Sequence, residues 1–418
     1  MKVLLVGATG FVGRHLLVAL NAAGHEVIAT SRGHHVRSVP GVEWQVLDLD
    51  RLATDAKHFI LPHGIDLLIN AAGLLSVDEQ ALRLTQDLGT WALFDLAARQ
   101  GVRVLHISAL GAGEQPDVPF LTSKAAADDY LMALGVPAVV LRPSLLVGAG
   151  GASSAWLARL SPWPLIPLLD LHARLQPLHI DDLSAAVLAL LRHWPAQSQV
   201  LPLVGPQALT LAQVLDQLRA AQGWASARYV SVPGVLSRAA AWLGERLGWR
   251  ALNQQSLRMA RRDNVADPEA LAAVCGYRVA PLSTRLVDWP NAGQSAQWAL
   301  RPLLLAVMLL IWLGTAAVCL GPGYDWSLRI MAEAGVSGTP ALFAVYAGAL
   351  CDGLLGLGML FKRWRRRAFQ AQLLLMGGYT LIISFVLPHY WFDPYAAVAK
   401  NLVLMVATLW LLWTEPRR

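Results

Sequence analysis

The sequence is poor in cysteine and in charged residues. Its three cysteines, Cys275, Cys319 and Cys351, have no metal-ligand spacing, so we expect neither a metal site nor a disulfide framework. Charged residues form only 15% of the chain and hydrophobic residues form 55%, an apolar excess that excludes an ordinary soluble protein. The first residues already form an apolar run, which predicts no cleavable signal peptide.

Acidic residues are scarce in the last part of the chain. Residues 298–418 contain ten lysines and arginines but only five acids, so they carry +5 of the formal net charge of +6. Residues 1–297 are therefore close to neutral. The basic pI reflects the C-terminal part, where apolar runs lie, and we expect no nucleic-acid partner.

Three glycines at a spacing of three follow an apolar run near the start of the chain. Residues 3–6 are all apolar, which is typical of a strand buried on both faces, and a helical pattern follows the third glycine. A strand that passes through glycines into a helix presents backbone N–H groups to a pyrophosphate. The expected cofactor-binding segment is Gly7, Ala8, Thr9, Gly10, Phe11, Val12 and Gly13.

The glycine spacing from Gly7 to Gly13 resembles that of the extended and atypical short-chain dehydrogenases/reductases, which include NAD(P)-dependent epimerases and dehydratases. The resemblance covers about residues 1–290 and is closest to the atypical group that includes an accessory subunit of respiratory complex I. It implies an α/β fold, with a Rossmann-like, doubly wound parallel sheet in residues 1–200. A small, mostly helical substrate lobe is expected in residues 201–297.

The end of the second expected strand bears on the choice of cofactor. Ser31 and Arg32 lie where an acid would bind the ribose hydroxyl of NAD, and these side chains suit the 2′-phosphate of NADP. We therefore expect NADP, with NAD as the alternative if Arg32 is only a solvated cation. The resemblance implies that Asp48, followed by Leu49, binds the adenine amino group, and the alternative is that Asp48 caps the next helix.

The remaining site residues follow later strands. The resemblance implies that Ser108 binds the substrate carbonyl and that Lys124 holds the nicotinamide ribose, so these two are the expected catalytic residues. The alternative for Lys124 is a cation on the surface of a helix. Backbone beside the cofactor is expected from two segments, which are Asn70, Ala71, Ala72 and Gly73, and Arg142 and Pro143.

The sequence departs from the family where the catalytic tyrosine is expected. That residue lies four positions before the lysine, and Phe120 stands there. A phenyl ring has no proton to donate, and general-acid catalysis typically contributes ~10²–10⁴-fold. Ketone reduction by the family's mechanism is therefore disfavoured. Other hydroxyl groups that lie nearby in the sequence belong to Ser108, Thr122, Ser123 and Tyr130.

The expected lobe carries local signals but no motif that identifies a substrate. The Thr210–Gln213 segment is typical of a capping box, and Asp181 is expected to cap a helix at 183–191. An apolar helical face is expected either in the core or against a bilayer, and it comprises Trp242, Leu243, Leu247 and Trp249. A basic cluster, typical of a solvated face but also attracted by a membrane surface, comprises Arg258, Arg261 and Arg262.

Four long apolar runs follow at 303–320, 341–361, 368–387 and 396–413. Because about 20 apolar residues at ~1.5 Å per residue cross a bilayer core, residues 298–418 are expected to form an all-α bundle of four transmembrane helices. The stretch from Asp393 to Leu402 resembles the DoxX-like membrane family, over about residues 300–418. That family has four spans and loose associations with quinone-linked redox processes.

Basic residues predict how these helices are oriented. Positive charge is concentrated between the second and third runs, at 362–367, which is expected to face the cytoplasm. The start of the first span beside Arg301 and the tail at Arg417 and Arg418 then face the cytoplasm as well. We expect a multi-pass protein of the inner (plasma) membrane with a cytoplasmic nucleotide domain.

Asp352 and Lys400 are ionisable residues within the apolar runs. Such residues are costly in a bilayer and usually face a partner or a cavity. We expect both to face the interior of the bundle, with the alternative that Lys400 reaches the outer interface.

The two parts together predict a membrane-anchored, NAD(P)H-binding oxidoreductase. Its expected partners are a nicotinamide dinucleotide, the lipid bilayer and a hydrophobic acceptor such as a quinone or a lipid-like carbonyl. The alternative is a non-catalytic nucleotide-binding scaffold or sensor, which lost its chemistry with Phe120 and assembles with membrane redox proteins. An epimerase or isomerase requires the missing tyrosine.

Overall fold

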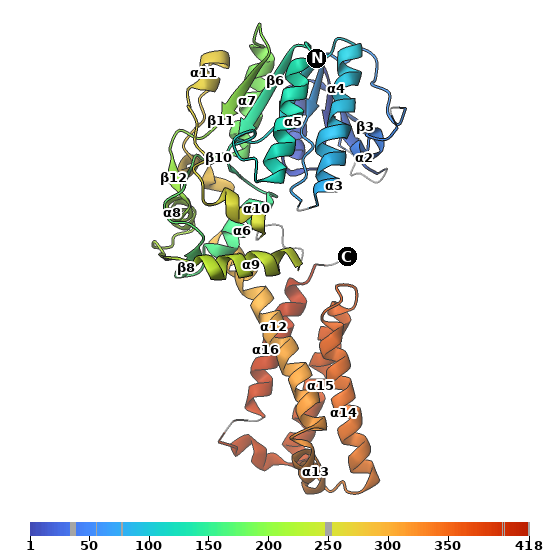
Figure 1. Cartoon of the computed structure of the whole chain (residues 1–418). Helices are drawn as coiled ribbons and strands as arrows, with labels where there is room; N and C mark the ends of the chain where they lie inside the picture. Colours follow the sequence, from blue (N-terminus) through green and yellow to red (C-terminus); the bar gives the residue numbers. More distant parts are fainter. Residues whose placement is uncertain are drawn as a thin grey trace. The chain divides into compact units, whose positions relative to one another are not determined.

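The computed structural model describes residues 1–33, 39–55, 57–76, 78–246, 253–394, 396 and 398–416. The chain divides into two compact units, unit 1 (Met1–Ser295) and unit 2 (Ala296–Arg418) (Figure 1). The sequence predictions for Leu247, Trp249, Arg417 and Arg418 lie outside the described residues.

Unit 1 contains a parallel sheet of seven strands in the order β11-β6-β5-β4-β1-β2-β3. The order reverses beside β1, where Val3 lies between Val27 of β2 and Leu67 of β4. This arrangement confirms the predicted Rossmann-like, doubly wound sheet, in which ligands bind at the carboxyl ends of the strands where the order reverses. The strands are β1 (Lys2–Val6), β2 (Glu26–Ser31), β3 (Val42–Val46), β4 (Leu67–Asn70), β5 (Arg103–Ile107), β6 (Ala138–Pro143) and β11 (Gln199–Leu203).

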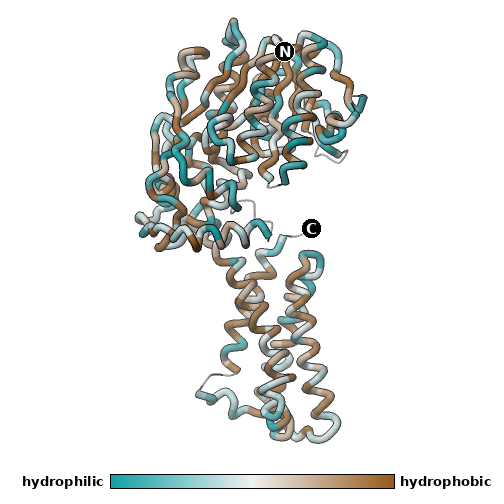
Figure 2. The backbone as a smooth tube through the Cα atoms, in the orientation of Figure 1, coloured by the Kyte–Doolittle hydropathy of each residue, from teal (hydrophilic) through white to brown (hydrophobic). Residues whose placement is uncertain are grey.

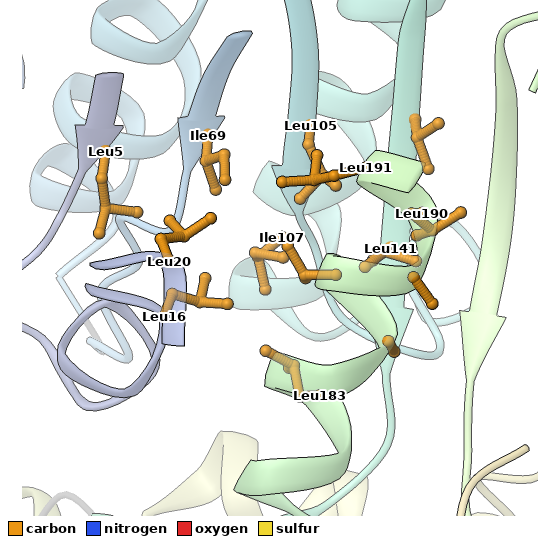
Figure 3. Close-up of a cluster of buried hydrophobic side chains, with 14 of the residues drawn as sticks. Leu5, Leu16, Leu20, Ile69, Leu105, Ile107, Leu141, Leu183, Leu190 and Leu191 are labelled. Carbon is orange, nitrogen blue, oxygen red and sulfur yellow. The ribbon is translucent and has the colours of Figure 1, made fainter. Parts of the chain in front are cut away.

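Helices cover both faces of this sheet. Successive residues of each strand point to opposite faces, so an entirely apolar strand presents apolar side chains on both faces, and helices bury them. Leu5 belongs to one buried cluster and Leu4 to the other. In Figure 3, Leu16 and Leu20 of one helix pack toward the strands beside Leu5. The first face carries α1 (Phe11–Ala22), α7 (Ile180–Arg192) and α11 (Ala270–Cys275), and the second carries α2 (Leu49–Leu52), α4 (Gly89–Arg99) and α5 (Pro119–Ala133). The short helices α3 (Glu79–Leu82) and η1 (Arg83–Leu88) precede α4.

A third buried cluster within unit 1 builds a lobe from segments that are distant in sequence. Leu157, Ile166, Leu215 and Leu286 all belong to it, so residues before and after position 200 share this core. Its elements are α6 (Ala152–Leu160), β8 (Leu165–Leu168), α8 (Leu211–Ala221), β13 (Arg228–Ser231) and η2 (Leu282–Asp288). Adjoining elements are β7 (Leu146–Val147), β9 (Arg174–Leu175), β10 (Leu178–His179), β12 (Leu209–Thr210), α9 (Gly234–Arg246) and α10 (Gln254–Met259).

Two helix starts in unit 1 test the capping predictions. The predicted capping box is confirmed, because the Thr210 side chain accepts from the Gln213 N–H and the Gln213 side chain accepts from the Thr210 N–H. The prediction that Asp181 caps α7 is wrong. The cap is His179, whose Nδ1 accepts from the Asp181 N–H at 3.3 Å, because α7 begins earlier than the apolar pattern indicated.

Unit 2 is all α-helical, and Figure 2 shows its long helices as mostly hydrophobic. Three helices are long and apolar enough to cross a membrane: α12 (Ala292–Leu320), α14 (Thr339–Gly358) and α15 (Arg365–Val386). The fourth predicted span corresponds to α16 (Ala399–Thr414), whose 16 residues are fewer than a full span needs. Two helices that the sequence analysis missed, α13 (Tyr324–Glu333) and η3 (Pro388–Phe392), lie in the connections.

The two ionisable residues in the apolar helices differ in burial. Asp352 of α14 is only 8% exposed, as predicted. Lys400 of α16 is exposed, so the prediction that it faces the interior of the bundle is wrong. Lys400 lies in the first turn of α16, where a long side chain can reach out of the bundle.

Candidate functional site

The three glycines make a tight passage from β1 into α1. Gly7 has φ +79°, and a Cβ there would lie 2.7 Å from the Ala72 nitrogen. A Cβ on Gly13 would lie 2.1 Å from the Gly7 oxygen, so only glycine permits this packing. Gly10 caps α1 without a side-chain hydrogen bond, and the first turn holds no acid. Backbone N–H groups at Phe11 and Val12 are thus available to an anion, since the first turn of a helix lacks intrahelical acceptors.

The carboxyl end of β2 lies where the adenosine part of a dinucleotide is expected. The Ser31 hydroxyl donates to the Gly33 carbonyl, and Arg32 is exposed. Asp48 is the N-cap of α2 and accepts from the Asp50 N–H at 3.1 Å, which is the capping role foreseen as the alternative. Leu49 is buried beneath it.

The segment after β4 runs beside the glycine turn. The Asn70 Oδ1 accepts from the Ala72 N–H at 3.1 Å, and the Ala71 N–H donates to the Val6 carbonyl at 3.0 Å. The Asn70 Nδ2 is buried without a partner among the described residues. These bonds hold the backbone of Ala72 and Gly73 at the carboxyl ends of β1 and β4, where the strand order reverses.

Lys124 of α5 is fully enclosed at the carboxyl ends of β4 and β5. It is 4% exposed, and its Nζ donates to the Ile107 carbonyl at 3.0 Å and to the Ala72 carbonyl at 3.3 Å. Burial lowers the pKa of Lys124 to about 8, although the Asp128 charge acts in the opposite direction. The alternative of a surface cation is therefore wrong, and a charged group stands next to Gly73.

Ser108 and Arg142, from the ends of β5 and β6, meet at a carboxyl group that the sequence analysis missed. The Ser108 hydroxyl donates to the Asp128 Oδ2 at 2.8 Å, and the Arg142 Nε donates to the same oxygen at 2.9 Å. Burial raises the pKa of Asp128, while the bonds from Ser108 and Arg142 oppose that rise. Pro143 fixes the neighbouring loop through its carbonyl, which accepts from the Leu110 N–H.

His106 adds a neutral ring to this cluster. Its Nε2 lies 3.6 Å from the Asp128 Oδ1, and both groups are about 1% exposed. Burial holds the pKa of His106 well below its usual value, and the nearby Lys124 charge contributes. A helical spacing of four from Lys124 to Asp128 was the available signal for this carboxyl, because such positions share one helix face.

Phe120 lies in the first turn of α5, and its backbone is fixed by the lobe. The Phe120 N–H donates to the Gln255 Oε1 at 3.1 Å, and the Gln255 Nε2 donates to the Ser76 carbonyl at 2.7 Å. Gln255 of α10 thus connects the lobe to the start of α5 and to the segment that follows β4. Arg262, one of the three arginines of the predicted basic cluster, lies nearby. It forms an ion pair at 2.8 Å with Asp117, which precedes α5.

Three of the hydroxyl groups considered as proton donors are engaged elsewhere. The Tyr130 hydroxyl donates to Asp95 of α4 at 2.8 Å, and its ring stacks on Trp91. The Thr122 hydroxyl donates to the Val118 carbonyl, and the Ser123 hydroxyl donates to the Phe120 carbonyl. The Ser108 hydroxyl donates to Asp128, and Ser108 directly follows Ile107, whose carbonyl accepts from Lys124.

Two families match separate parts of the chain. Residues 3–200 match the NAD dependent epimerase/dehydratase family, and residues 309–409 match the DoxX-like family. The solved structure of a putative epimerase from Burkholderia cenocepacia has a TM-score of 0.56 to this chain at 19% identity. The superposition covers 71% of this chain and 98% of the epimerase chain, which shows a shared fold.

Two curated relatives match the N-terminal part. A ceramide reductase of Caulobacter vibrioides is 30% identical over 197 residues, which are 46% of this chain and 61% of the relative. Subunit 9 of the NADH dehydrogenase [ubiquinone] 1 alpha subcomplex from Dictyostelium discoideum is 26% identical over 222 residues, 51% of this chain. The chain spans 61% of that relative's length as well.

Proposed function

Because its N-terminal part is a domain of the NAD dependent epimerase/dehydratase family and its C-terminal part is a DoxX-like domain, we propose that this chain is a membrane-bound NAD(P)H-dependent reductase. Its acceptor is a hydrophobic carbonyl compound dissolved in the bilayer, a quinone or a lipid ketone. The observation that carries the proposal is the enclosed Lys124 ammonium, which is bonded to the carbonyls of Ala72 and Ile107 beside the glycine turn.

Each end of a dinucleotide has a place in this proposal. The N–H groups of Phe11 and Val12 would hold the pyrophosphate, at the start of a helix that the glycines allow to pack closely against β1. Lys124, next to Gly73, would hold the nicotinamide ribose. Arg32 is exposed at the end of β2 and supports a preference for NADP, since a guanidinium binds a phosphate well.

The chemistry needs a hydride and a proton. A bound nicotinamide dinucleotide supplies the hydride to the acceptor. The Ser108 hydroxyl, which donates to the Asp128 Oδ2 at 2.8 Å in this structure, would turn to the carbonyl oxygen of the acceptor and give it a proton. Water would supply the proton that Ser108 then recovers by way of the Asp128 carboxyl group. Lys124 stabilises the negative charge that develops on the oxygen.

The missing phenol favours one class of acceptor. Reduced quinones are much stronger acids than alcohols, so their oxygens demand less from a proton donor than a ketone oxygen does. A serine backed by a buried carboxyl group therefore suits a quinone better than a ketone. The similarity to a ceramide reductase supports a lipid ketone as the second candidate.

The proposed orientation places unit 1 in the cytoplasm of a cell whose plasma membrane holds unit 2. Within unit 2, Glu415 pairs with Arg301 and, at 3.6 Å, with Arg365. These pairs support one shared end of the bundle for the start of α12, the start of α15 and the end of α16. The concentration of basic residues at this end supports a cytoplasmic side. A protease-sensitive tag at residue 1 is expected to be cleaved only after the inner face of the membrane is exposed.

The test is NADPH and NADH oxidation by the full chain in lipid nanodiscs that contain either decylubiquinone or a long-chain lipid ketone. We expect turnover with the quinone and a loss of about 10²-fold or more in Lys124→Ala. Lys57→Ala is the matched control, because Lys57 is exposed, and it is expected to keep full activity. Dinucleotide binding without turnover on either acceptor would favour the scaffold.

A second variant separates the two acceptor classes. Phe120→Tyr restores the phenol and is expected to raise ketone reduction more than quinone reduction, since only the ketone needs the stronger proton donor. Equal effects on both acceptors would contradict the assignment of Ser108 as a donor suited to quinones.

A further inference from the structure

Helix α9 (Gly234–Arg246) exposes a continuous apolar face. Val235 is 70% exposed, Leu236 60%, Trp242 49% and Leu243 47%. Residues separated by seven positions lie on the same side of a helix, so Val235 with Trp242 and Leu236 with Leu243 form one strip. Single exposed apolar residues are ordinary on a protein surface, whereas such a strip marks an interaction site.

The opposite face of α9 is fixed to the lobe, so the strip is held outward. Ser237, Ala241 and Gly244 are buried. The Arg261 Nη2 donates to the Ser237 hydroxyl at 3.0 Å, and the Gln254 N–H donates to the Glu245 side chain at 3.0 Å. The helix therefore has one partnered face and one face that no described residue covers.

Basic side chains flank the strip. The Arg246 guanidinium lies 4.2 Å from the centre of the Trp242 ring, and Arg238 is exposed on the next turn. Neither arginine has an ion-pair partner in the part of the chain that the structure describes. Glu245, the acidic residue of this helix, accepts a hydrogen bond from the Gln254 N–H. Tryptophan and leucine beside unpaired arginines are typical of a helix that lies in a lipid–water interface.

We propose that α9 lies in the headgroup region of a bilayer that contains anionic lipids. Trp242 and Leu243 insert between lipids, and Arg238 and Arg246 bind headgroup phosphates. A bilayer is the partner that the chain itself indicates, because the chain continues from unit 1 into the apolar helices of unit 2. The inference is independent of the proposed reductase, since it concerns contact with lipid and not turnover.

The experiment places a spin label on the strip. Leu243→Cys is labelled in a full chain whose three native cysteines are replaced by serine, and the protein is reconstituted in nanodiscs with phosphatidylglycerol. Continuous-wave spin resonance then compares the accessibility of the label to oxygen, which concentrates in lipid, and to a nickel chelate, which stays in water. Val18→Cys is the matched control, because Val18 is an exposed apolar residue on helix α1.

We expect the label at residue 243 to meet oxygen more than nickel, and the label at residue 18 to show the reverse. Arg238→Glu with Arg246→Glu is expected to lower oxygen accessibility at residue 243, since each basic residue near an anionic surface contributes about fivefold to binding. A label at residue 243 that meets nickel as freely as the control overturns the proposal. A label shielded from both reagents, or one broadened by a second label, also overturns it, because protein then covers the strip.

Discussion

Two buried carboxyl groups, Asp182 of unit 1 and Asp352 of unit 2, differ in whether they have partners. In unit 1, Asp182 is fully buried and accepts from the Tyr277 hydroxyl at 2.6 Å and from Arg285 at 2.9 Å. In unit 2, Asp352 has no hydrogen-bond or ion-pair partner among the described residues. A paired buried acid secures a fold, whereas an unpaired ionisable residue in an apolar bundle marks a functional position.

The two units also differ in how their interiors are built. In unit 1, glycines bring backbone segments into contact, and we propose that N–H groups and one enclosed lysine recognise the ligand there. The buried cluster of unit 2 is apolar and includes Met308, Trp312 and Phe369. On the proposal made above, unit 1 carries the chemistry and unit 2 supplies contact with lipid.

Gly13→Val has the largest expected effect and tests whether the two units fail separately. The added side chain starts 2.1 Å from the Gly7 oxygen, so α1 must move away from β1. We expect dinucleotide binding to be lost and unit 1 to be destabilised by more than about 3 kcal/mol. Binding is measured by calorimetry and unfolding by circular dichroism.

Gly24→Ala is the control for that variant, because Gly24 lies just after the end of α1 and has open space at the Cβ position. It should cost only the strain of its positive φ, about 1 kcal/mol. Retention of dinucleotide affinity in Gly13→Val would contradict the backbone site.

Asp182→Asn and Asp352→Asn test the comparison of carboxyl groups directly. Asp182→Asn is expected to lower the free energy of unfolding of unit 1 by about 2 kcal/mol, because Tyr277 and Arg285 lose a charged acceptor. Asp352→Asn is expected to leave stability unchanged or improved, and to lower turnover with the membrane-dissolved acceptor. Thermal unfolding and turnover in nanodiscs measure the two effects. A destabilised Asp352→Asn with normal turnover would show that Asp352 is structural.

The pH dependence of turnover tests the enclosed lysine. Since burial lowers the pKa of Lys124 to about 8, the ammonium is present below that pH and is lost above it. We therefore expect kcat/KM to fall about tenfold per pH unit above pH ~8. In Lys124→Arg, whose side chain stays charged, this alkaline fall is expected to disappear even if the maximum rate is lower. A fall at the same pH in both forms would assign the titration to another group.

Tyr130→Phe has the smallest expected effect. The Tyr130 hydroxyl is bonded to Asp95 between α4 and α5, so its loss should cost about 1 kcal/mol of stability and leave turnover within twofold. A steady-state rate and a melting curve suffice for the test. A large loss of turnover would return Tyr130 to the list of proton donors.

Local patterns explain why much of unit 1 could be predicted. Apolar runs specify strands buried on both faces, and the spacing from Gly7 to Gly13 specifies the turn, since each depends on neighbours in sequence. The Thr210 capping box was predictable for the same reason. The Asp128 cluster was not, because Ser108, Arg142 and Asp128 come together only when β5, β6 and α5 pack.

The errors in the sequence predictions have physical causes. His179 replaces Asp181 as a cap because a ring nitrogen can accept from a backbone N–H as a carboxylate does. The direction of Lys400 could not be predicted, because the apolar runs of unit 2 have no polar stripe that indicates which side faces the bundle. The fourth predicted span at 396–413 corresponds to α16, which the structure describes over Ala399–Thr414.

The most direct test of the account is a single turnover of NADPH bound to the full chain in nanodiscs, followed by its near-ultraviolet absorbance. We predict oxidation only when the nanodisc contains an acceptor and Lys124 is intact, and a slower rate when the transferred hydrogen is deuterium. Bound NADPH that stays reduced with every quinone and lipid ketone would contradict the account.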